Sequence, residues 1–356
     1  MKLRTMFTAI AISAATMGVA ALTGCGSTTS AGTSNTSGTT ATTTTAATPV
    51  KYFTNTSSAA NQLTASNTLF VDVRSFALYS TGHIPGAVRN TVSLNSATIT
   101  ATGKAGSYGL TQAEFINLAN TLGITPSTQV IAYDTDNSSS VGRFVWTLLH
   151  YGHTNVAILD GGYPKWVSEK RATLTKSNST TPTPNATSYV VPSTIPNIEI
   201  FPAAVEAAID ESGSVIWDSR TGLEYIGENL MTNPRGGHIP SAVNLNWADL
   251  QVQNSNGVYV LKSSTELLSL LQQYGITPDK QIIVHCQSGV RAGYATVVLL
   301  GLGYPNVQDY TGSFGEWSAA TYPSGTTTPT DLVNGTNPTT GLYYMYPVYN
   351  SLLVGN

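Results

Sequence analysis

The chain has 356 residues, of which 41% are hydrophobic and only 10% are charged, and its formal net charge is −3. This apolar content can build real hydrophobic cores, and the length exceeds what one compact domain usually needs, so we expect two domains. No run of Lys or Arg is present to follow a phosphate backbone, which argues against a nucleic-acid partner.

The first 24 residues have the features of an export signal. Lys2 and Arg4 precede an apolar stretch of mostly small residues, which ends in Leu-Thr-Gly-Cys at residues 22–25. This ending resembles the bacterial lipobox, and the resemblance implies cleavage before Cys25 and attachment of lipid to its sulfur. The alternative is an ordinary secretory signal in which Cys25 happens to fall near the cut.

Residues 25–49 are rich in Thr, Ser, Gly and Ala and show no apolar periodicity, so we expect a flexible tether. With lipid on Cys25, this tether would lift the globular part clear of a membrane surface. The expected location is therefore the bacterial cell envelope, outside the cytoplasm, on the periplasmic face or at the outer membrane.

The chain beyond residue 49 contains the same series of sequence motifs twice. GITPSTQVIAYD at 123–134 returns as GITPDKQIIVHC at 275–286, and three further pairs follow the same order: VDVRS at 71–75 with WDSRT at 217–221, GHIPGAVRN at 82–90 with GHIPSAVNL at 237–245, and LDGGYPKW at 159–166 with DYTGSFGEW at 309–317. This predicts two copies of one domain, at 50–176 and 198–322, with a linker rich in Pro, Thr and Ser at 177–197.

Each copy alternates short apolar runs with helical patterns. The runs at 68–73 and 129–134, and at 214–219 and 281–286, are typical of buried parallel strands. Helical spacing with closing glycines is found at 111–123, 141–152, 264–275 and 291–303. The alternation predicts an α/β fold with a parallel sheet flanked by helices in each copy. Sites in such sheets lie at the carboxyl ends of the strands, where Asp134 and Cys286 fall.

Cys286 is the one cysteine besides Cys25, so a lipidated Cys25 leaves it without a disulfide partner. The loop after it enters a helix near Arg291, and Gly289 permits a positive φ in that turn. Backbone N–H groups at a helix N-terminus, together with the charge of Arg291, favour the nucleophilic thiolate. Gln287 and Ser288 add side-chain hydrogen bonds for an incoming anion.

These motifs together resemble the rhodanese family, specifically the tandem-domain thiosulfate and 3-mercaptopyruvate sulfurtransferases. The resemblance rests on the two GHIP motifs, WDSR, DGGYPKW with SFGEW, and CQSGVR, and it covers about 50–322. It implies two tandem rhodanese-like domains, each a parallel sheet flanked by helices. It also implies that the second copy carries the catalytic Cys286, while the first copy, with Asp134 in the equivalent place, is inactive.

The implied reaction takes a sulfane sulfur from a small anionic donor onto Cys286 as a persulfide. The sulfur then passes to cyanide in an assay, or to a thiol, a thioredoxin-like protein or another protein in the cell. The resemblance implies no metal and no organic cofactor. It implies a substrate-binding set consisting of Gln287, Ser288, Gly289, Val290, Arg291 and Arg235.

The donor stays open between thiosulfate, 3-mercaptopyruvate and polysulfide. Ser288 to Val290, and Arg235 before the second GHIP motif, match the mercaptopyruvate branch, whereas the basic residues that thiosulfate enzymes place after the Cys are missing. Arg291 stands where both branches usually have Thr, and Glu224 stands where both often carry a substrate-binding Arg. Neither branch therefore matches completely.

Residues repeated in both copies are expected to have structural roles first. Asp218 with Arg220 recurs as Asp72 with Arg74, which predicts an ion pair that supports the loop rather than one that does chemistry. His83 is expected to hydrogen-bond within its turn, with reach into the cleft between the copies as the alternative.

Two other functions are alternatives to sulfur transfer. A non-catalytic sulfur-binding or scaffold lipoprotein would keep the fold without turnover. A phosphatase or arsenate reductase would need a Cys-x5-Arg loop, whereas Cys286 and Arg291 are one residue closer. The Tyr-rich tail at 323–356 lies outside the repeat and has no assigned role.

Overall fold

The computed structural model describes residues 48–95, 100–101, 104–105, 108–135, 138–175, 183 and 188–319. Cys25 and the predicted signal peptide, residues 26–47 of the predicted tether, residues 177–182 and 184–187 of the predicted linker, and the tail at 323–356 lie outside the described residues. Within the described part, no helix is both long enough and apolar enough to cross a membrane.

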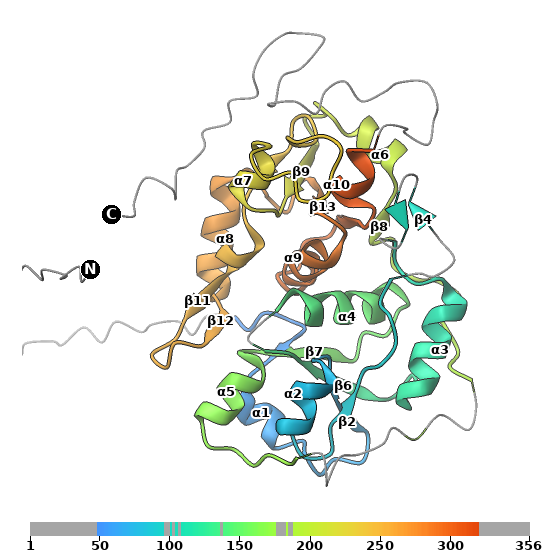
Figure 1. Cartoon of the computed structure of the whole chain (residues 1–356), viewed down its shortest axis with the longest axis vertical. Coiled ribbons are helices and arrows are strands. Elements are labelled where there is room, and N and C mark those ends of the chain that lie inside the picture. Colours follow the sequence, from blue (N-terminus) through green and yellow to red (C-terminus); the bar gives the residue numbers. More distant parts are fainter. Residues whose placement is uncertain are drawn as a thin grey trace, which may run out of the picture. The chain divides into compact units, whose positions relative to one another are not determined.

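The first copy forms a five-stranded parallel sheet in the order β1-β7-β6-β2-β3 (Figure 1). Its strands are β1 (Phe53–Thr54), β2 (Thr68–Asp72), β3 (Val88–Arg89), β6 (Gln129–Tyr133) and β7 (Val156–Leu159). Its helices are α1 (Thr56–Ala60), α2 (Phe76–Thr81), α3 (Gln112–Leu122), α4 (Ser139–His150) and α5 (Gly162–Ser168). A small antiparallel hairpin joins β4 (Thr100–Ala101) to β5 (Lys104–Ala105).

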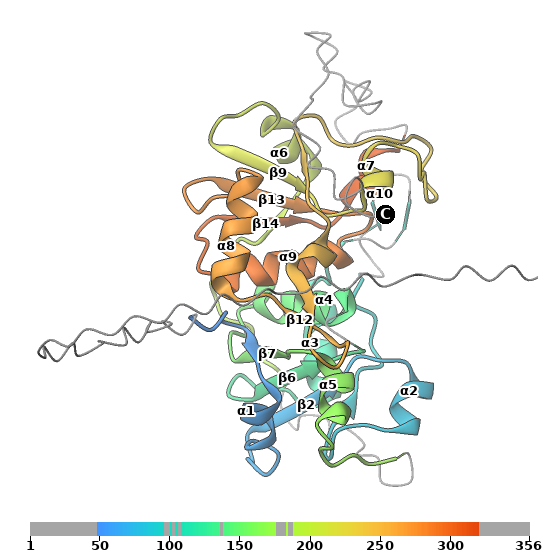
Figure 2. The same cartoon turned by 90° about the vertical axis from the view of Figure 1, so that its left-hand side faces the viewer.

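The second copy forms a five-stranded parallel sheet in the order β10-β9-β13-β14-β8, and Figure 2 shows β9, β13 and β14 in succession. Its strands are β8 (Glu199–Ile200), β9 (Ser214–Asp218), β10 (Val243–Asn244), β13 (Gln281–His285) and β14 (Val307–Tyr310). Its helices are α6 (Pro202–Ala207), α7 (Gly222–Tyr225), the 3-10 helix η2 (Trp247–Leu250), α8 (Ser264–Gln273), α9 (Val290–Gly301) and α10 (Ser313–Trp317). An antiparallel hairpin pairs β11 (Gln251–Gln253) with β12 (Tyr259–Leu261).

Read from the opposite edge, the second sheet has the same strand order as the first, with β13 in the central place of β6. The predicted α/β fold with two parallel sheets is thus confirmed, and the four predicted helical patterns correspond to α3, α4, α8 and α9. Capping boxes fix where two of these helices begin: Thr111 with Glu114 starts α3, and Ser263 with Glu266 starts α8.

Alternation along the central strands divides each copy into two apolar layers. In β13, Ile282 and Val284 face the core covered by α8 and α9, whereas Ile283 faces the core covered by α6, α7 and α10. In the first copy, Val130 and Ala132 likewise face α3 and α4. Because successive side chains of a strand point to opposite faces, the residue after His285 returns to the α8 and α9 side. That residue is Cys286.

Helices α4 and α9 pack against each other through facing glycines, and one apolar core continues through both. A Cβ atom added to Gly142 would lie 2.4 Å from the Cα of Tyr294, and one added to Gly293 would lie 3.2 Å from the Cα of Arg143. The close approach therefore depends on both glycines, and it brings the α4 backbone of the first copy next to the start of α9, which follows Cys286.

Candidate functional site

Cys286 follows the last residue of β13 at the carboxyl edge of the second sheet. Its side chain is buried, and the next three residues turn sharply into α9, with Gly289 at φ 78° as the helix N-cap. The left-handed turn at Gly289 is the one expected from the sequence. A Cβ atom there would also lie 2.8 Å from the carbonyl oxygen of Thr311, so the position needs glycine for space as well as for its backbone angle.

The turn favours the ionised form of the Cys286 thiol. Burial acts first and raises the thiol pKa, but the charge of Arg291 and hydrogen bonds from the backbone N–H groups of Ala292, Ser288 and Arg291 act in the other direction. The outcome is a pKa below the ordinary value of 9.0. The geometry therefore favours the thiolate, which is the reactive form of cysteine, through backbone dipoles and the charge of Arg291.

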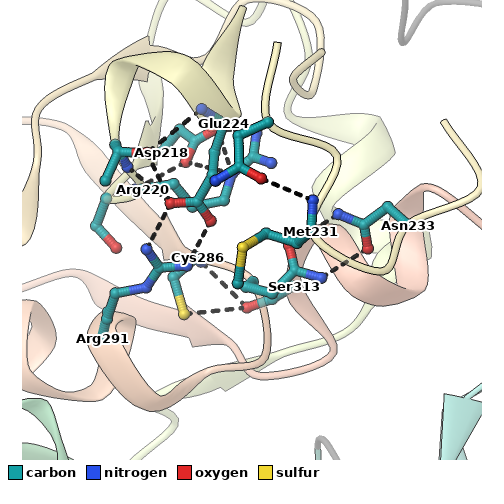
Figure 3. Close-up of polar contacts among 12 residues, drawn as sticks. Asp218, Arg220, Glu224, Met231, Asn233, Cys286, Arg291 and Ser313 are labelled. Atoms are coloured by element: carbon teal, nitrogen blue, oxygen red, sulfur yellow. Dashed lines mark hydrogen bonds and ion pairs between the residues drawn. The ribbon is translucent and has the colours of Figure 1, made fainter. Parts of the chain in front are cut away.

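Ser313, the first residue of α10, holds the loop through its side chain (Figure 3). Its Oγ accepts hydrogen bonds from the backbone N of Cys286 at 3.1 Å and of Gly289 at 2.9 Å, donates to the carbonyl oxygen of Tyr310 at 2.8 Å, and lies 4.0 Å from the Cys286 sulfur. Its φ of 54° lies in the left-handed region, which is unfavourable for a residue with a Cβ.

Sequence reasoning did not single out Ser313. The signal was present in the repeat, because DYTGSFGEW aligns Ser313 with Gly162 of DGGYPKW, and Gly162 has nearly the same φ of 55°. Both copies keep the same left-handed backbone conformation at this position. The first copy has a glycine there, whereas the second has a serine whose hydroxyl forms hydrogen bonds.

Arg291 forms a two-pronged ion pair with Glu224, which lies on α7 (Figure 3). The two nitrogen–oxygen distances are 2.7 and 2.8 Å, and Glu224 is almost fully buried. Burial alone would raise the pKa of Glu224, but the hydrogen bond and charge of Arg291 lower it below its ordinary value. The cation that follows Cys286 is therefore already balanced by a carboxylate in the described structure.

Asp218 and Arg220 form a buried ion pair at 2.6 Å, and Arg220 also donates to the carbonyl oxygen of Gly237. The first copy repeats this arrangement with Asp72, Arg74 and the carbonyl oxygen of Gly82. Because both copies have the pair, it belongs to the fold and holds the GHIP loop against the sheet.

The histidines of the two GHIP motifs are also equivalent. His83 is fully buried, lies 2.9 Å from the carbonyl oxygen of Tyr79 through Nδ1, and stacks on the Tyr79 ring. His238 makes the same contacts with Tyr225. The structure thus places His83 in the interior of its own copy rather than at an accessible surface.

The remaining predicted binding residues are engaged with the segment between α7 and β10. Gln287 exchanges two side-chain hydrogen bonds with Asn233, at 2.9 and 2.6 Å. Arg235 donates to the carbonyl oxygens of three consecutive residues at the end of α10: Trp317, Ser318 and Ala319. Gln287 and Arg235 therefore hold this segment beside the Cys286 loop. Ser288 and Val290 contribute to the turn itself.

The first copy also reaches the Cys286 loop, through Arg143 on α4. This buried guanidinium lies 3.5 Å from the carbonyl oxygen of Gly289 and 3.6 Å from the carboxylate of Asp309. Burial lowers the pKa of Arg143, and the charges of Asp309, Glu199 and Cys286 oppose that shift. Sequence reasoning missed Arg143 because nothing in its local pattern separates it from an ordinary helix residue.

In the first copy, the residue equivalent to Cys286 is Asp134, and its side chain forms hydrogen bonds with residues close to it in the chain. The carboxylate of Asp134 accepts hydrogen bonds from the backbone N and hydroxyl of Thr135, and from the hydroxyl of Ser138 at the start of α4. No sulfur nucleophile stands there. Among the described residues, no group of three or more His, Cys, Asp or Glu side chains is placed to hold a metal ion.

A cavity of about 560 Å³ lies beside the start of α9 and is lined by both copies. From the first copy come Arg89, Asn90, Ser140 and Arg143, and from the second copy comes Val290. Val290 is the first residue of α9, so the cavity lies next to the loop that follows Cys286.

Comparison with known proteins agrees with the duplicated architecture. The Rhodanese-like domain model matches the chain twice, at residues 55–169 and 201–320. A thiosulfate sulfurtransferase of Pseudomonas aeruginosa is 31% identical over 255 residues, which is 70% of this chain and 87% of that protein. The sulfur carrier protein TtuD of Thermus thermophilus is 34% identical over 264 residues, which is 67% of this chain and 84% of that protein.

Solved structures show the same fold at lower identity. The anaerobic ergothioneine biosynthesis enzyme from Chlorobium limicola, in complex with trimethyl histidine, is 23% identical with a TM-score of 0.60. That match covers 70% of this chain, which spans 62% of the length of the enzyme. Two parallel sheets of one topology, two matches to one domain model, and relatives aligned over most of the chain lead to one assignment: the chain belongs to the rhodanese-like family and carries the domain in tandem.

Proposed function

We propose that this protein is a sulfurtransferase that carries sulfane sulfur on Cys286 as a persulfide. The observation that carries the proposal is the buried Cys286 thiol, whose pKa is lowered by backbone N–H groups and by Arg291. Relatives named thiosulfate sulfurtransferase and sulfur carrier protein support sulfur transfer as the reaction class.

The reaction proceeds in two displacement steps. The Cys286 thiolate attacks the sulfane sulfur of a donor, the new bond is Sγ–S, and the bond from that sulfur to the rest of the donor breaks with its electron pair. With thiosulfate the leaving group is sulfite, and with 3-mercaptopyruvate it is pyruvate. A thiolate or cyanide acceptor then attacks the outer sulfur and restores the Cys286 thiolate, so no external oxidant or reductant is needed.

The residues around Cys286 have separate parts in this proposal. The backbone N–H groups of Ser288, Arg291 and Ala292 hold the ionised sulfur. Gln287 and Arg235 hold the neighbouring segment at the site. The ion pair of Asp218 with Arg220 supports the loop. The first copy is inactive in sulfur transfer because Asp134 cannot accept sulfur, and it contributes Arg143 to the second copy.

The pairing of Arg291 with Glu224 favours sulfur transfer over phosphatase or arsenate reductase chemistry. A phosphate-binding loop needs its arginine to close around a tetrahedral dianion, but this guanidinium is held by a carboxylate. The spacing between Cys286 and Arg291 is also one residue shorter than in such loops.

The test compares the purified full-length protein with Cys286→Ser. We expect persulfide on Cys286 after exposure to a sulfane donor, detected as one added sulfur by mass spectrometry, and thiocyanate formation when cyanide is supplied. Both signals should vanish in Cys286→Ser. A folded protein with a titratable Cys286 that takes sulfur from neither thiosulfate, 3-mercaptopyruvate nor a hydropersulfide would instead favour a scaffold role.

We also propose that lipid on Cys25 anchors the protein in a bacterial cell envelope, outside the cytoplasm. The support is the lipobox-like ending of the first 24 residues and the polar tether that follows. In cells, Cys25→Ser should abolish incorporation of labelled palmitate and move the protein out of the membrane fraction. Membrane retention of the Cys25→Ser protein without label would contradict the anchor.

A further inference from the structure

The Glu224–Arg291 ion pair places a carboxylate in the charge environment of the reactive sulfur. Arg291 acts on Cys286 directly, because its charge helps to lower the thiol pKa. Glu224 holds both terminal nitrogens of the same guanidinium. An anionic donor that uses Arg291 must therefore compete with a buried, two-pronged carboxylate, and the competition costs more than it would at an exposed pair.

The neighbouring arginines also face acidic side chains. Arg220 is held by the carboxylate of Asp218 at 2.6 Å, and Arg143 lies 3.6 Å from Asp309, whose pKa is raised by burial well above its ordinary value. Arg235 donates to the backbone carbonyl oxygens of residues 317–319. Among the described residues around Cys286, backbone N–H groups support one negative charge on the sulfur. The nearby arginine side chains already face carboxyl groups or carbonyl oxygens.

Donors differ in how much negative charge they bring to this loop. With thiosulfate, the thiolate and a dianion combine to give Cys–S–S⁻ and SO₃²⁻, so three negative charges share the site during the step. With an organic hydropersulfide, Cys–S⁻ and R–S–SH give Cys–S–SH and R–S⁻, so one negative charge is present throughout. The first reaction needs an available cation far more than the second, because like charges at short range repel strongly in a buried site.

We propose that Glu224 is a specificity-determining residue that disfavours dianionic sulfur donors and shifts the preference of Cys286 toward hydropersulfides. This inference rests on the proposed sulfur transfer at Cys286 and deepens it by naming the donor class. Glu224 acts by holding the Arg291 guanidinium, which would otherwise be available to a sulfonate or carboxylate group of the donor.

The experiment compares Glu224→Gln with the unmodified full-length protein. Gln keeps the size of the side chain and the capping box with Thr221 at the start of α7, so the local helix should persist. The matched control is Glu266→Gln, because Glu266 closes the same kind of capping box with Ser263 on α8, where it is exposed. Glu224→Ala serves as a second variant, and the thermal unfolding midpoint of each protein confirms that it is folded.

The readout is the rate constant of Cys286 persulfidation in a single turnover. The donors are thiosulfate and the hydropersulfide of 2-mercaptoethanol, measured separately by mass spectrometry. The ratio of the two rate constants is the decisive quantity, because any change in the ionised fraction of Cys286 affects both donors alike. We expect the unmodified protein to prefer the hydropersulfide, and Glu224→Gln to raise the thiosulfate-to-hydropersulfide ratio about 10- to 100-fold, the effect of one close charge.

The possible outcomes separate this inference from the proposed function. An unchanged ratio in Glu224→Gln and Glu224→Ala, with Cys286 still persulfidated by both donors, would overturn the role of Glu224 and leave sulfur transfer intact. An equal loss with both donors would show that Glu224 only supports the loop, and it would overturn the inference as well. If no donor modifies Cys286 in the unmodified protein, the proposed function itself fails. Glu266→Gln should leave the ratio unchanged.

Discussion

The two copies share their scaffold and differ in the loop at the end of the central strand. Both sheets have one strand order, and both hold the GHIP loop with an Asp–Arg pair and a histidine stacked on a tyrosine. At the loop itself, Asp134 bonds to its neighbours in one copy, whereas Cys286 lies in a cradle of backbone N–H groups in the other. The repeated features therefore specify the fold, and the features that differ specify the chemistry.

The largest expected effect comes from moving the nucleophile to the other copy. In the double variant Asp134→Cys/Cys286→Ser we expect thiocyanate formation to fall at least about a thousandfold, to the level of Cys286→Ser alone. The first copy has Gly162 where the second has Ser313, and no basic residue in the first turn of α4, which begins at Ser139. Turnover restored by the thiol introduced in the first copy would show that the fold alone activates a cysteine.

The contact of the first copy with the second can be tested at Arg143. Burial already raises the pKa of Asp309 well above its ordinary value. Replacing Arg143 by Met leaves this buried carboxyl group without the guanidinium at 3.6 Å, and we expect a loss of about 3 kcal/mol in the free energy of unfolding. Urea titration would measure this loss. Arg89→Met, a change of the same kind outside the buried pair, should shift stability by less than about 0.5 kcal/mol. Equal effects of the two variants would remove the case for Arg143 as a link between the copies.

The copies also differ before the loop, where His285 stands in the place of Tyr133. Burial lowers the pKa of His285 to about 4, because the imidazolium loses hydration, while Asp218 only partly offsets this. The folded state then binds fewer protons than the unfolded state as the pH falls from 6.5 toward 4. Stability from this group is complete above pH 6.5 and is lost as the pH falls, by at most about 3 kcal/mol.

The measurement for His285 compares urea unfolding of the unmodified protein and of His285→Asn at several pH values. The difference between the two proteins should change with pH across this interval and be constant above it. Using the difference removes the contributions of the other buried histidines. A difference that does not depend on pH would mean that His285 keeps its ordinary pKa in the folded protein.

The smallest expected effect concerns Ser313, whose hydroxyl has no counterpart at Gly162. Ser313→Ala and Ser313→Gly both remove the hydrogen bonds to the backbone N of Cys286 and Gly289, and each should slow persulfidation about tenfold. Gly should be more stable than Ala by about 1 kcal/mol, because φ of 54° strains a residue with a Cβ. Equal stability of the two variants would contradict the strain, and unchanged persulfidation would contradict the positioning role.

The sequence predicted most of the fold because its signals are local. Apolar runs of strand length and helical spacing closed by glycine act within a few neighbours, so the central strands and long helices could be located. The repeat supported these predictions, because the same pattern of strands and helices occurs in both copies. The short edge strands β1 and β8 escaped this reasoning, because two residues give no periodic pattern.

The site was predicted in part. The turn at Gly289, the start of α9 and the ion pair of Asp218 with Arg220 followed from residue type and position. The contacts of Gln287 with Asn233 and of Arg235 with the end of α10 did not, since they join segments far apart in the chain. A side chain that a motif suggests for substrate binding can already be hydrogen-bonded to a residue outside that motif.

What the sequence determined by itself is the duplicated parallel-sheet architecture and the position of one thiol at the carboxyl edge of the second sheet. Both follow from patterns that act over a few residues. Only the tertiary structure decided what surrounds that thiol. Ser313 contacts its sulfur from α10, Glu224 on α7 holds Arg291, and Arg143 of the first copy reaches the carbonyl oxygen of Gly289. Electrostatic interactions in a buried site depend on distance through space rather than along the chain, and packing alone sets those distances.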